Sequence, residues 1–277
     1  MSTATTAASA PASAAVRPRP AHFADVVRSE WTKLRTVRST FFSLLAAVVL
    51  GIGLSVLISA VAAHNYTGRL SGRQVQWDPT RLSTAGLGIA QLAIAVLGIM
   101  VVTSEYSSGM IRTSLAAVPR RGWLLGAKSV VYTAVALVVG EIIAFVAFFS
   151  GQAVISGLAP TANLGQPGVL RAVAGSGLYL AALGLLAVAV AALVRQAAAG
   201  IAILVALLFV LPGVANALPT SWRQPVEEYW PTNAGQDLTN VVRATHSLGP
   251  WAGFGVMCLF VAIVVVTAFV LIERRDA

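Results

Sequence analysis

Long apolar runs alternate with short, polar and mostly basic segments along the chain. A helix of about 20 mostly apolar residues crosses the roughly 30 Å of hydrocarbon in a bilayer. Six runs have the required length and composition, at residues 40–62, 82–104, 127–149, 172–194, 197–218 and 250–272. The pattern predicts an all-α membrane protein with a single six-helix transmembrane domain over residues 22–275.

Breaks in this pattern predict further features. Only "RQAAAG" separates the fourth and fifth runs, which predicts a tight helical hairpin. Pro212 and Gly213 predict that the fifth helix ends early or kinks. Residues 1–21 are Ala, Ser, Thr and Pro with no apolar core, which predicts a disordered tail rather than a signal peptide.

Charge is scarce and unevenly distributed. Only 10% of the residues are charged, against about 25% in soluble domains, so lipid must solvate most of the surface. The net charge of +9 would favour a nucleic-acid partner in a soluble protein, but here the basic residues flank apolar runs and none is expected. With an inner N-terminus, 13 of the 19 Lys and Arg residues are cytoplasmic. This predicts a multi-pass plasma-membrane protein with both termini in the cytoplasm.

The segment "HFADVVRSEWTKLRTVRST" precedes the first run. Phe23, Val27, Trp31 and Leu34 recur with helical spacing, which predicts an amphipathic helix in the inner headgroup layer. The alternative is a basic flank that only fixes orientation. The residues assigned to the interfacial helix are Glu30, Trp31, Lys33, Leu34, Arg35 and Arg38.

A second amphipathic segment, "TSEYSSGMIRTSLAAVPRRG", lies between the second and third runs. Ser107 or Ser108 is suited to cap a helix start, Pro119 closes the segment, and Gly109 is expected to allow close backbone approach. Apolar side chains recur on one face, at Ile111, Leu115 and Val118. Two helical turns have little stability alone, so we expect the segment to rest on a partner or on the bundle. The alternative is an ordinary basic loop.

The stretches "SEWTKLRTVRS" and "EYSSGMIRTSLAAVPRR" resemble the permease subunit of ATP-binding-cassette exporters of the type-2 permease family. The resemblance is to stand-alone permeases common in high-GC Gram-positive bacteria, and it covers about residues 22–275. In that family the segment between helices two and three is a coupling helix that docks in a groove of the ATPase. The residues that this resemblance assigns to ATPase coupling are Glu105, Gly109, Ile111, Arg112, Leu115, Pro119, Arg120 and Arg121. Met110 stands where Thr is more frequent.

The resemblance implies that the chain dimerises with a second permease copy, identical or not, and changes state when a separate ATPase closes. Expected partners are therefore an ATPase subunit, a second permease and membrane lipids. No cofactor is expected on this chain, because ATP and Mg²⁺ belong to the partner. "GWLLGAKS" lacks the second glycine of a phosphate-binding loop, with Ala127 in its place, and it runs into an apolar run. The expected cargo is a small or lipid-like molecule that moves outward.

Glu141 lies near the middle of the third run, where a charge costs about 2.5–3.5 kcal/mol. It is either a substrate or coupling site or a protonated acid bonded to a neighbouring helix, with Gln91 as a conceivable partner. The rival functions are a proton-coupled secondary transporter that uses Glu141 and a structural or signalling membrane subunit. An intramembrane metalloprotease would need His-Glu-x-x-His, which the chain lacks.

The fourth run and the segment after the fifth run carry two weaker sequence features. Gly177 and Ala181 in the fourth run would permit close helix packing. Residues 213–249 contain Trp222, Tyr229 and Trp230, which suit the outer interface. The resemblance implies re-entrant gate helices in this outer segment.

Overall fold

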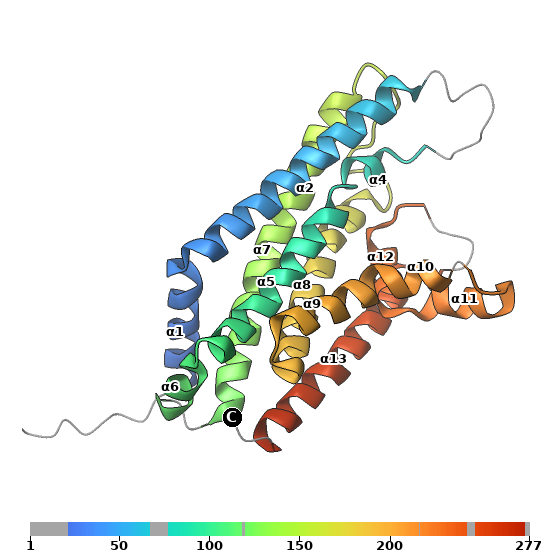
Figure 1. Ribbon diagram of the computed structural model, residues 1–277. Coiled ribbons are helices and arrows are strands. Elements are labelled where there is room, and N and C mark those ends of the chain that lie inside the picture. The colour runs from blue at the N-terminus through green and yellow to red at the C-terminus, as the bar shows by residue number, and fades with distance from the viewer. Residues whose placement is uncertain (1–21, 67–76, 118–119, 216, 243–246, 275–277) are drawn as a thin grey trace, which may run out of the picture.

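The computed structural model describes residues 22–66, 77–117, 120–215, 217–242 and 247–274. Over these residues the chain is helical and contains no strand. Six helical segments are long and apolar enough to cross a membrane, which confirms the predicted fold class and number of spans. They form an elongated bundle (Figure 1). The tail predicted over residues 1–21 lies outside the described residues.

The six spans differ in places from their predicted bounds. They are α2 (Arg38–His64), α5 (Leu87–Ser107), α7 (Arg121–Ile155), α8 (Val169–Val194), the segment Ala197–Ala215, and α13 (Pro250–Arg274). The second span starts five residues later than predicted, because a separate short helix, α4 (Pro79–Ser83), precedes it. Asp78 caps α4 by accepting a hydrogen bond from the Arg81 backbone N–H at 3.0 Å.

Helix α8 occupies the centre of the bundle. It packs against α5, α7 and α13, and 72% of the residues in its most apolar 18-residue stretch are buried. Glycines permit this close packing: a Cβ at Gly98 of α5 would lie 2.6 Å from the Ala187 side chain of α8. A protein interior without voids transmits displacements between such helices, because side chains in contact cannot be compressed further.

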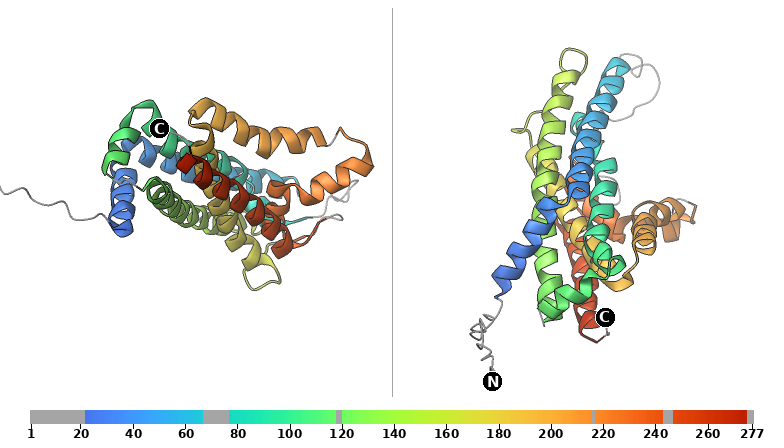
Figure 2. Two further views of the ribbon diagram at one scale, coloured as in Figure 1. Left: turned by 90° about the horizontal axis from the view of Figure 1, so that it is seen from below. Right: turned by 60° about the vertical axis from the view of Figure 1, so that its left-hand side comes forward.

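The fifth span is irregular, as the sequence predicts. It consists of α9 (Ala197–Val205), the π-helical turn η1 (Ala206–Val210) and α10 (Leu211–Ala215). The π turn comes directly before Pro212, which has no N–H to continue the α-helical hydrogen bonds. Only 17% of the residues in its most apolar stretch are buried, and the span packs along one side of the bundle, where α9 contacts α5 and α8 (Figure 2).

The turn between α8 and α9 is the tight hairpin that the sequence predicts. Arg195 has a φ of 59°, in the left-handed region, and ends α8, while α9 starts at Ala197. The Arg195 guanidinium lies 5.3 Å from the centre of the Tyr106 ring. This cation–π contact ties the turn to the end of α5.

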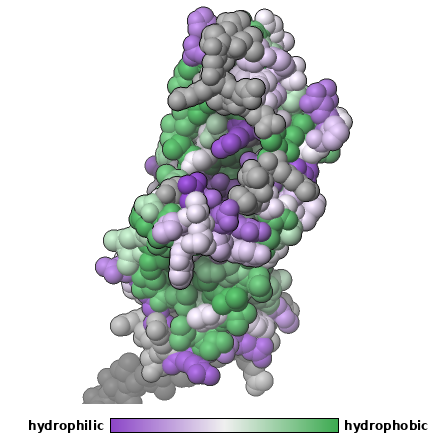
Figure 3. Space-filling view, turned by 90° about the vertical axis from the view of Figure 1, so that its right-hand side faces the viewer, coloured by the Kyte–Doolittle hydropathy of each residue, from purple (hydrophilic) through white to green (hydrophobic). Residues whose placement is uncertain are grey.

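A cap of short helices follows the fifth span. It contains α11 (Thr220–Tyr229), α12 (Pro231–Gln236) and the 3₁₀ turn η2 (Asp237–Thr239). Arg171 of α8 holds the cap by donating to the carbonyl oxygens of Leu238 and Asn240, both at 2.9 Å. The face that carries α9, α10 and α11 shows polar side chains at mid-height above a hydrophobic surface (Figure 3).

The two remaining helices lie together at the other end of the bundle. Helix α1 (Phe23–Thr36) joins α2 through a bend at Val37, and α6 (Met110–Ala117) follows α5. The last turn of α13 lies at this same end (Figures 1 and 2). The packed face of α1 carries Val26 and Glu30, whereas Trp31 is 49% exposed. The predicted apolar stripe of α1 is therefore offset from the face that contacts the bundle.

Candidate functional site

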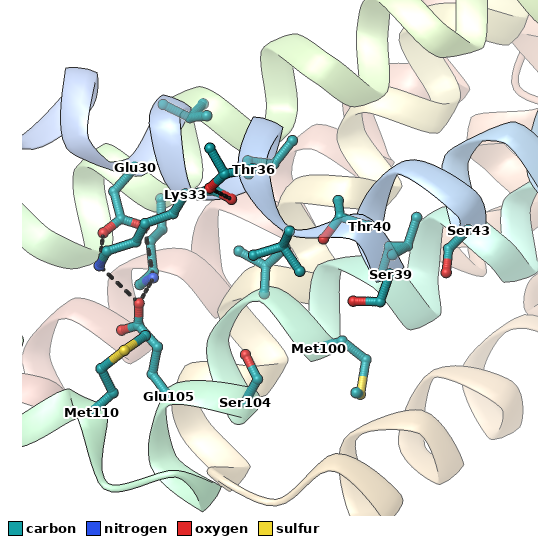
Figure 4. A pocket seen from close by; sticks show the side chains of 16 residues that line it. Glu30, Lys33, Thr36, Ser39, Thr40, Ser43, Met100, Ser104, Glu105 and Met110 are labelled. Atoms are coloured by element: carbon teal, nitrogen blue, oxygen red, sulfur yellow. Dashed lines mark hydrogen bonds and ion pairs between the residues drawn. The ribbon is translucent and has the colours of Figure 1, made fainter.

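Four charged side chains meet where α1, α5 and α7 come together, and we call Glu30, Lys33, Glu105 and Lys128 the ion cluster. The Lys128 Nζ lies 2.7 Å from Glu30 Oε2 and 2.7 Å from Glu105 Oε1. The Lys33 Nζ lies 2.7 Å from Glu30 Oε1 and 3.0 Å from Glu105 Oε1. Two lysines thus share one oxygen of Glu105 (Figure 4). The cluster links three helices through charge-assisted hydrogen bonds.

Burial makes this pairing obligatory. The Glu30, Glu105 and Lys128 side chains are only 4% exposed, whereas the Lys33 side chain is 34% exposed. Removing a charge from water is costly unless an opposite charge and hydrogen bonds compensate. Two carboxylates and two ammonium groups give the cluster a formal charge of zero. Among the oxygen and nitrogen atoms of the ion cluster, the Oε2 of Glu105 lacks a hydrogen-bond partner in the described structure.

The cluster alters the titration of Lys33, which lies in α1, ahead of the first span. Desolvation alone would lower the pKa of this ammonium, but hydrogen bonds and charge attraction from Glu30 and Glu105 outweigh it. The pKa of Lys33 is therefore raised above its ordinary value of 10.5. Because an opposite charge favours the charged form, Lys33 stays protonated at neutral pH.

The sequence assigned these residues to different features. Glu105 was predicted to contact an ATPase and Glu30 and Lys33 to belong to an interfacial helix, yet the structure brings all three together. The sequence analysis assigns Lys128 no role, because its segment only resembles a phosphate-binding loop, yet Lys128 pairs with both carboxylates of the cluster. A signal was present: a lysine inside an apolar helix needs a carboxylate partner, and Glu105 flanks the preceding apolar run at the same end.

Helix α6 rests on this region through one apolar anchor. Ile111 is 8% exposed and packs with Val26 of α1 and with Leu124 and Ala127 of α7. A helix is thus present between the second and third spans as α6, and it packs on the bundle at Ile111. Leu115, predicted for the same face, lies in α6, but its side chain is outside the described structure.

The start of α6 differs from its predicted form. Ser107 and Ser108 do not cap α6, because both hydroxyls donate to the carbonyl oxygen of Ser104 and finish α5 instead. Within the described chain no atom lies within 4 Å of the Cβ position of Gly109, apart from its own chain neighbours, so the expected close approach is not made to the bundle. Its φ of 71° explains the glycine, since this left-handed conformation turns the chain from α5 into α6.

The predicted basic residues are only partly described. Arg120 is exposed at the N-cap of α7, and its guanidinium lies 4.7 Å from the centre of the Trp123 ring. Arg121 is half-buried in the first turn of α7. The Arg112 side chain and Pro119 lie outside the described structure. In and after α1, Leu34 is half-buried, while Arg35 and Arg38 are exposed.

Residues 26–213 match the family described as "ABC-2 family transporter protein". The chain belongs to the ABC-2 transporter family. Its matched region includes the ion cluster, α6 and the first four spans, and it ends within the irregular fifth span. This family supplies the membrane component of the transporter, a permease that pairs with an ABC ATPase subunit. A search of curated proteins found no match.

Polar residues inside this ABC-2 permease are placed differently from the prediction. Gln91 is not the partner of Glu141, because its Oε1 accepts from the Tyr179 hydroxyl at 3.1 Å. Gln236 of the cap donates in turn to that hydroxyl at 3.2 Å. Tyr179 is the residue that the sequence analysis missed here, since nothing in the sequence indicates which helix faces Gln91.

Glu141 packs against α8 at Gly177. A Cβ at Gly177 would collide with the Glu141 carboxyl group, so the glycine makes room for this acid. The close helix contact predicted at Gly177 therefore exists, with Glu141 and Gly140 of α7 opposite. In the described structure the Glu141 Oε2 has no hydrogen-bond partner. Among the described residues, no group of three or more His, Cys, Asp and Glu side chains is placed to hold a metal ion.

Proposed function

We propose that this chain is the permease subunit of an ABC exporter in the plasma membrane. It moves a small or lipid-like molecule outward by alternating access, and a separate ATPase subunit drives the change of state. Both termini and α6 face the cytoplasm, in agreement with the distribution of Lys and Arg residues. ATP and Mg²⁺ are bound by the partner, and this chain supplies no catalytic group.

The ion cluster beneath α6 is the observation that carries the proposal. Helix α6 follows α5 directly, and Glu105 lies only five residues before Met110. A push on α6 therefore reaches the end of α5, and through Glu105 it reaches Lys128 of α7 and Lys33 of α1. The Ile111 contact with α1 and α7 adds a second route. This arrangement suits a coupling helix, because a docked ATPase needs a short lever joined rigidly to several spans.

Exposed apolar faces support a second permease copy and surrounding lipid as further partners. Within one chain, only 22% of the residues in the most apolar stretch of α2 and 17% of those in the fifth span are buried. Bulky apolar side chains project from both, among them Phe41 and Phe42 of α2 and Phe209 of η1. We propose that a second permease, identical or related, covers part of this surface and that lipid covers the rest.

Membrane orientation is tested by labelling introduced cysteines. Cys258 is the only cysteine, so a Cys258→Ser background removes all native thiols. Thr113→Cys on α6 and Ser221→Cys on α11 then form a matched pair, since both positions are exposed at different parts of the bundle. A membrane-impermeant maleimide added to intact cells should label Ser221→Cys and leave Thr113→Cys unmodified until the cells are lysed. The reverse pattern would reject a cytoplasmic α6.

ATPase docking is tested with charge reversals in the reconstituted complex. Arg112→Glu with Arg120→Glu should lower ATP-driven transport at least tenfold and weaken binding of the ATPase subunit. Arg223→Glu on α11, remote from α6, is the matched reversal and should leave ATPase binding unchanged. Glu141→Gln should retain transport, because the exporter does not depend on a proton at that site. Loss of transport with Glu141→Gln alone would favour the proton-coupled alternative.

A further inference from the structure

A pocket of about 270 Å³ opens beside the ion cluster, between the α1–α2 bend and α5. One side carries hydroxyl groups from the bend and the first turns of α2. Another side is apolar and comes from α5 and α7. The hydroxyl side is lined by Thr36, Ser39, Thr40 and Ser43, and the apolar side by Leu97, Met100, Val101 and Val131 (Figure 4). The pocket is therefore amphipathic, with the ion cluster at its charged end.

The surroundings of the opening are those of a membrane-facing surface. Ser39 and Ser104 at its edge are exposed, and Met100 is 44% exposed. On the same helix as Ser39, Phe41 and Phe42 do not line the pocket and are 60% and 63% exposed. Both flanking helices, α2 and α5, are apolar spans. The opening therefore lies beside two apolar spans, which suits a ligand whose tail remains among lipid chains.

The charged end has one unused acceptor. Glu105 is 3% exposed, lines the pocket, and has no hydrogen bond to its Oε2 from the described residues. The carboxylate is already paired through Oε1, but a buried acceptor without a donor still costs free energy, so a ligand that supplies a donor to Oε2 is favoured. Oε2 has less than 1 Å² of accessible surface, so a ligand reaches it only after a neighbouring side chain moves. Met110 of α6 lies beside this carboxylate (Figure 4). Its side chain is 46% exposed and unbranched, so it moves aside easily.

We propose that this pocket binds one uncharged amphiphile whose head group carries hydroxyl groups, as in a monoacylglycerol or a simple glycolipid. One hydroxyl donates to Glu105 Oε2, and others pair with the hydroxyl side of the pocket at Ser39 and Ser43. The start of the acyl chain lies along the apolar side, and the remainder extends into the bilayer. Small-molecule pockets are typically about 300–1,000 Å³, so 270 Å³ fits a head group and the first few methylenes.

Charge decides against ionic head groups. The ion cluster is already neutral, so a bound ammonium or carboxylate would add an unpaired charge to a largely buried site. A quaternary ammonium also has no N–H to donate to Glu105. A neutral hydroxyl satisfies the acceptor and leaves the charge balance unchanged. This inference concerns binding to the isolated chain and does not depend on the direction of transport.

The test is direct binding to the full-length chain in detergent, measured by native mass spectrometry with four probes of equal chain length. They are 1-monooleoylglycerol, methyl oleate, oleate and oleyltrimethylammonium. The hydroxylated probe should bind with one copy per chain and at least tenfold more tightly than the other three. Equal binding of methyl oleate would show that the pocket binds acyl chains without recognising hydroxyl groups, and would reject the proposal. Tighter binding of either ion would also overturn the proposed chemistry.

Two variants locate the site. Ser43→Phe should fill the pocket from the hydroxyl side and reduce 1-monooleoylglycerol binding at least tenfold, whereas Thr267→Phe on the exposed face of α13 should not. Glu105→Gln keeps the shape but places an amide at the acceptor, and it should weaken binding about five- to tenfold. Unchanged binding in folded Ser43→Phe, shown by native helicity and a single elution peak, would place the amphiphile elsewhere. A transport defect alone would bear on the proposed function and leave this result intact.

Discussion

The ion cluster makes a strong and specific prediction for Lys128→Met. Methionine keeps much of the volume of the lysine stem but removes the ammonium that pairs with Glu30 and Glu105, each at 2.7 Å. The cluster then changes from neutral to a net charge of −1 while its carboxylates stay buried. Glu30 Oε1 and Glu105 Oε1 keep Lys33, but Glu30 Oε2 loses its partner.

Removing one partner of a buried pair costs about 3–5 kcal/mol. Because Lys33 remains within 3.0 Å of both carboxylates, we expect the lower end, about 3 kcal/mol. At roughly 2–4 °C per kcal/mol for chains of about 200 residues, Tm should fall by about 6–12 °C. The assay is thermal unfolding of the purified chain in one detergent, followed by tryptophan fluorescence and by loss of the monodisperse elution peak.

Two controls give this prediction its sharpness. Arg223→Met removes the cation of the more exposed Arg223–Glu227 pair, also at 2.7 Å, and should cost less than about 1 kcal/mol. Adding Glu30→Gln to Lys128→Met restores neutrality and should recover at least about 1 kcal/mol, a coupling that a double-mutant cycle isolates. The reasoning is refuted if Lys128→Met unfolds within 2 °C of the wild type, or if the double variant is no more stable than the single.

Three further results should follow from the structure. Gly177→Ala should cost no more than about 1 kcal/mol, because the Glu141 side chain that the new methyl group meets is flexible and can rotate aside, and Glu141→Ala should remove this cost. Trp230→Phe removes the 2.9 Å hydrogen bond to the Leu207 carbonyl in η1, so hydrogen exchange there should accelerate and stability fall by about 1 kcal/mol. The raised pKa of Lys33 stabilises the fold fully below pH 10.5, and this contribution is lost as the pH rises through the higher folded value. Lys33→Met should therefore flatten the fall in Tm as the pH rises above 10.5.

The helical architecture follows from the sequence because its signal is local. Each span is a continuous apolar run, and the energetic penalty for unpaired backbone in lipid leaves helix as the only form for such runs. Pro212 likewise predicts the irregular fifth span. The late start of α5 was not visible, since it depends on a tertiary contact: Gly86 N–H donates to Ser55 Oγ of α2 at 2.9 Å. No window of sequence contains both residues.

The candidate site was predicted in parts but not as a unit. Glu30 and Lys33 are helical neighbours, yet Lys33 and Glu105 are 72 positions apart and Glu30 and Lys128 are 98 apart. The topology inferred from the Lys and Arg distribution puts these segments at the same end of the molecule without indicating which faces meet. The bend at Val37 decides this, because it returns α1 across α7 instead of letting it continue along the axis of α2.

A buried ion cluster is a poor device for stability alone, because well-packed apolar residues of similar volume often stabilise a fold equally or better. Its distinguishing property is directional: two ammonium groups share one oxygen of Glu105, so α1, α5 and α7 fit in one register and lose hydrogen bonds in any other. A sliding apolar contact has no such discrimination. The cluster sits where α5 passes into α6, the segment that we propose receives the force of the ATPase. Movement of α6 is passed to α1, α5 and α7 only if these helices keep their relative positions while α6 is pushed. That requirement accounts for four charged residues at a place where leucine would stabilise the fold equally well.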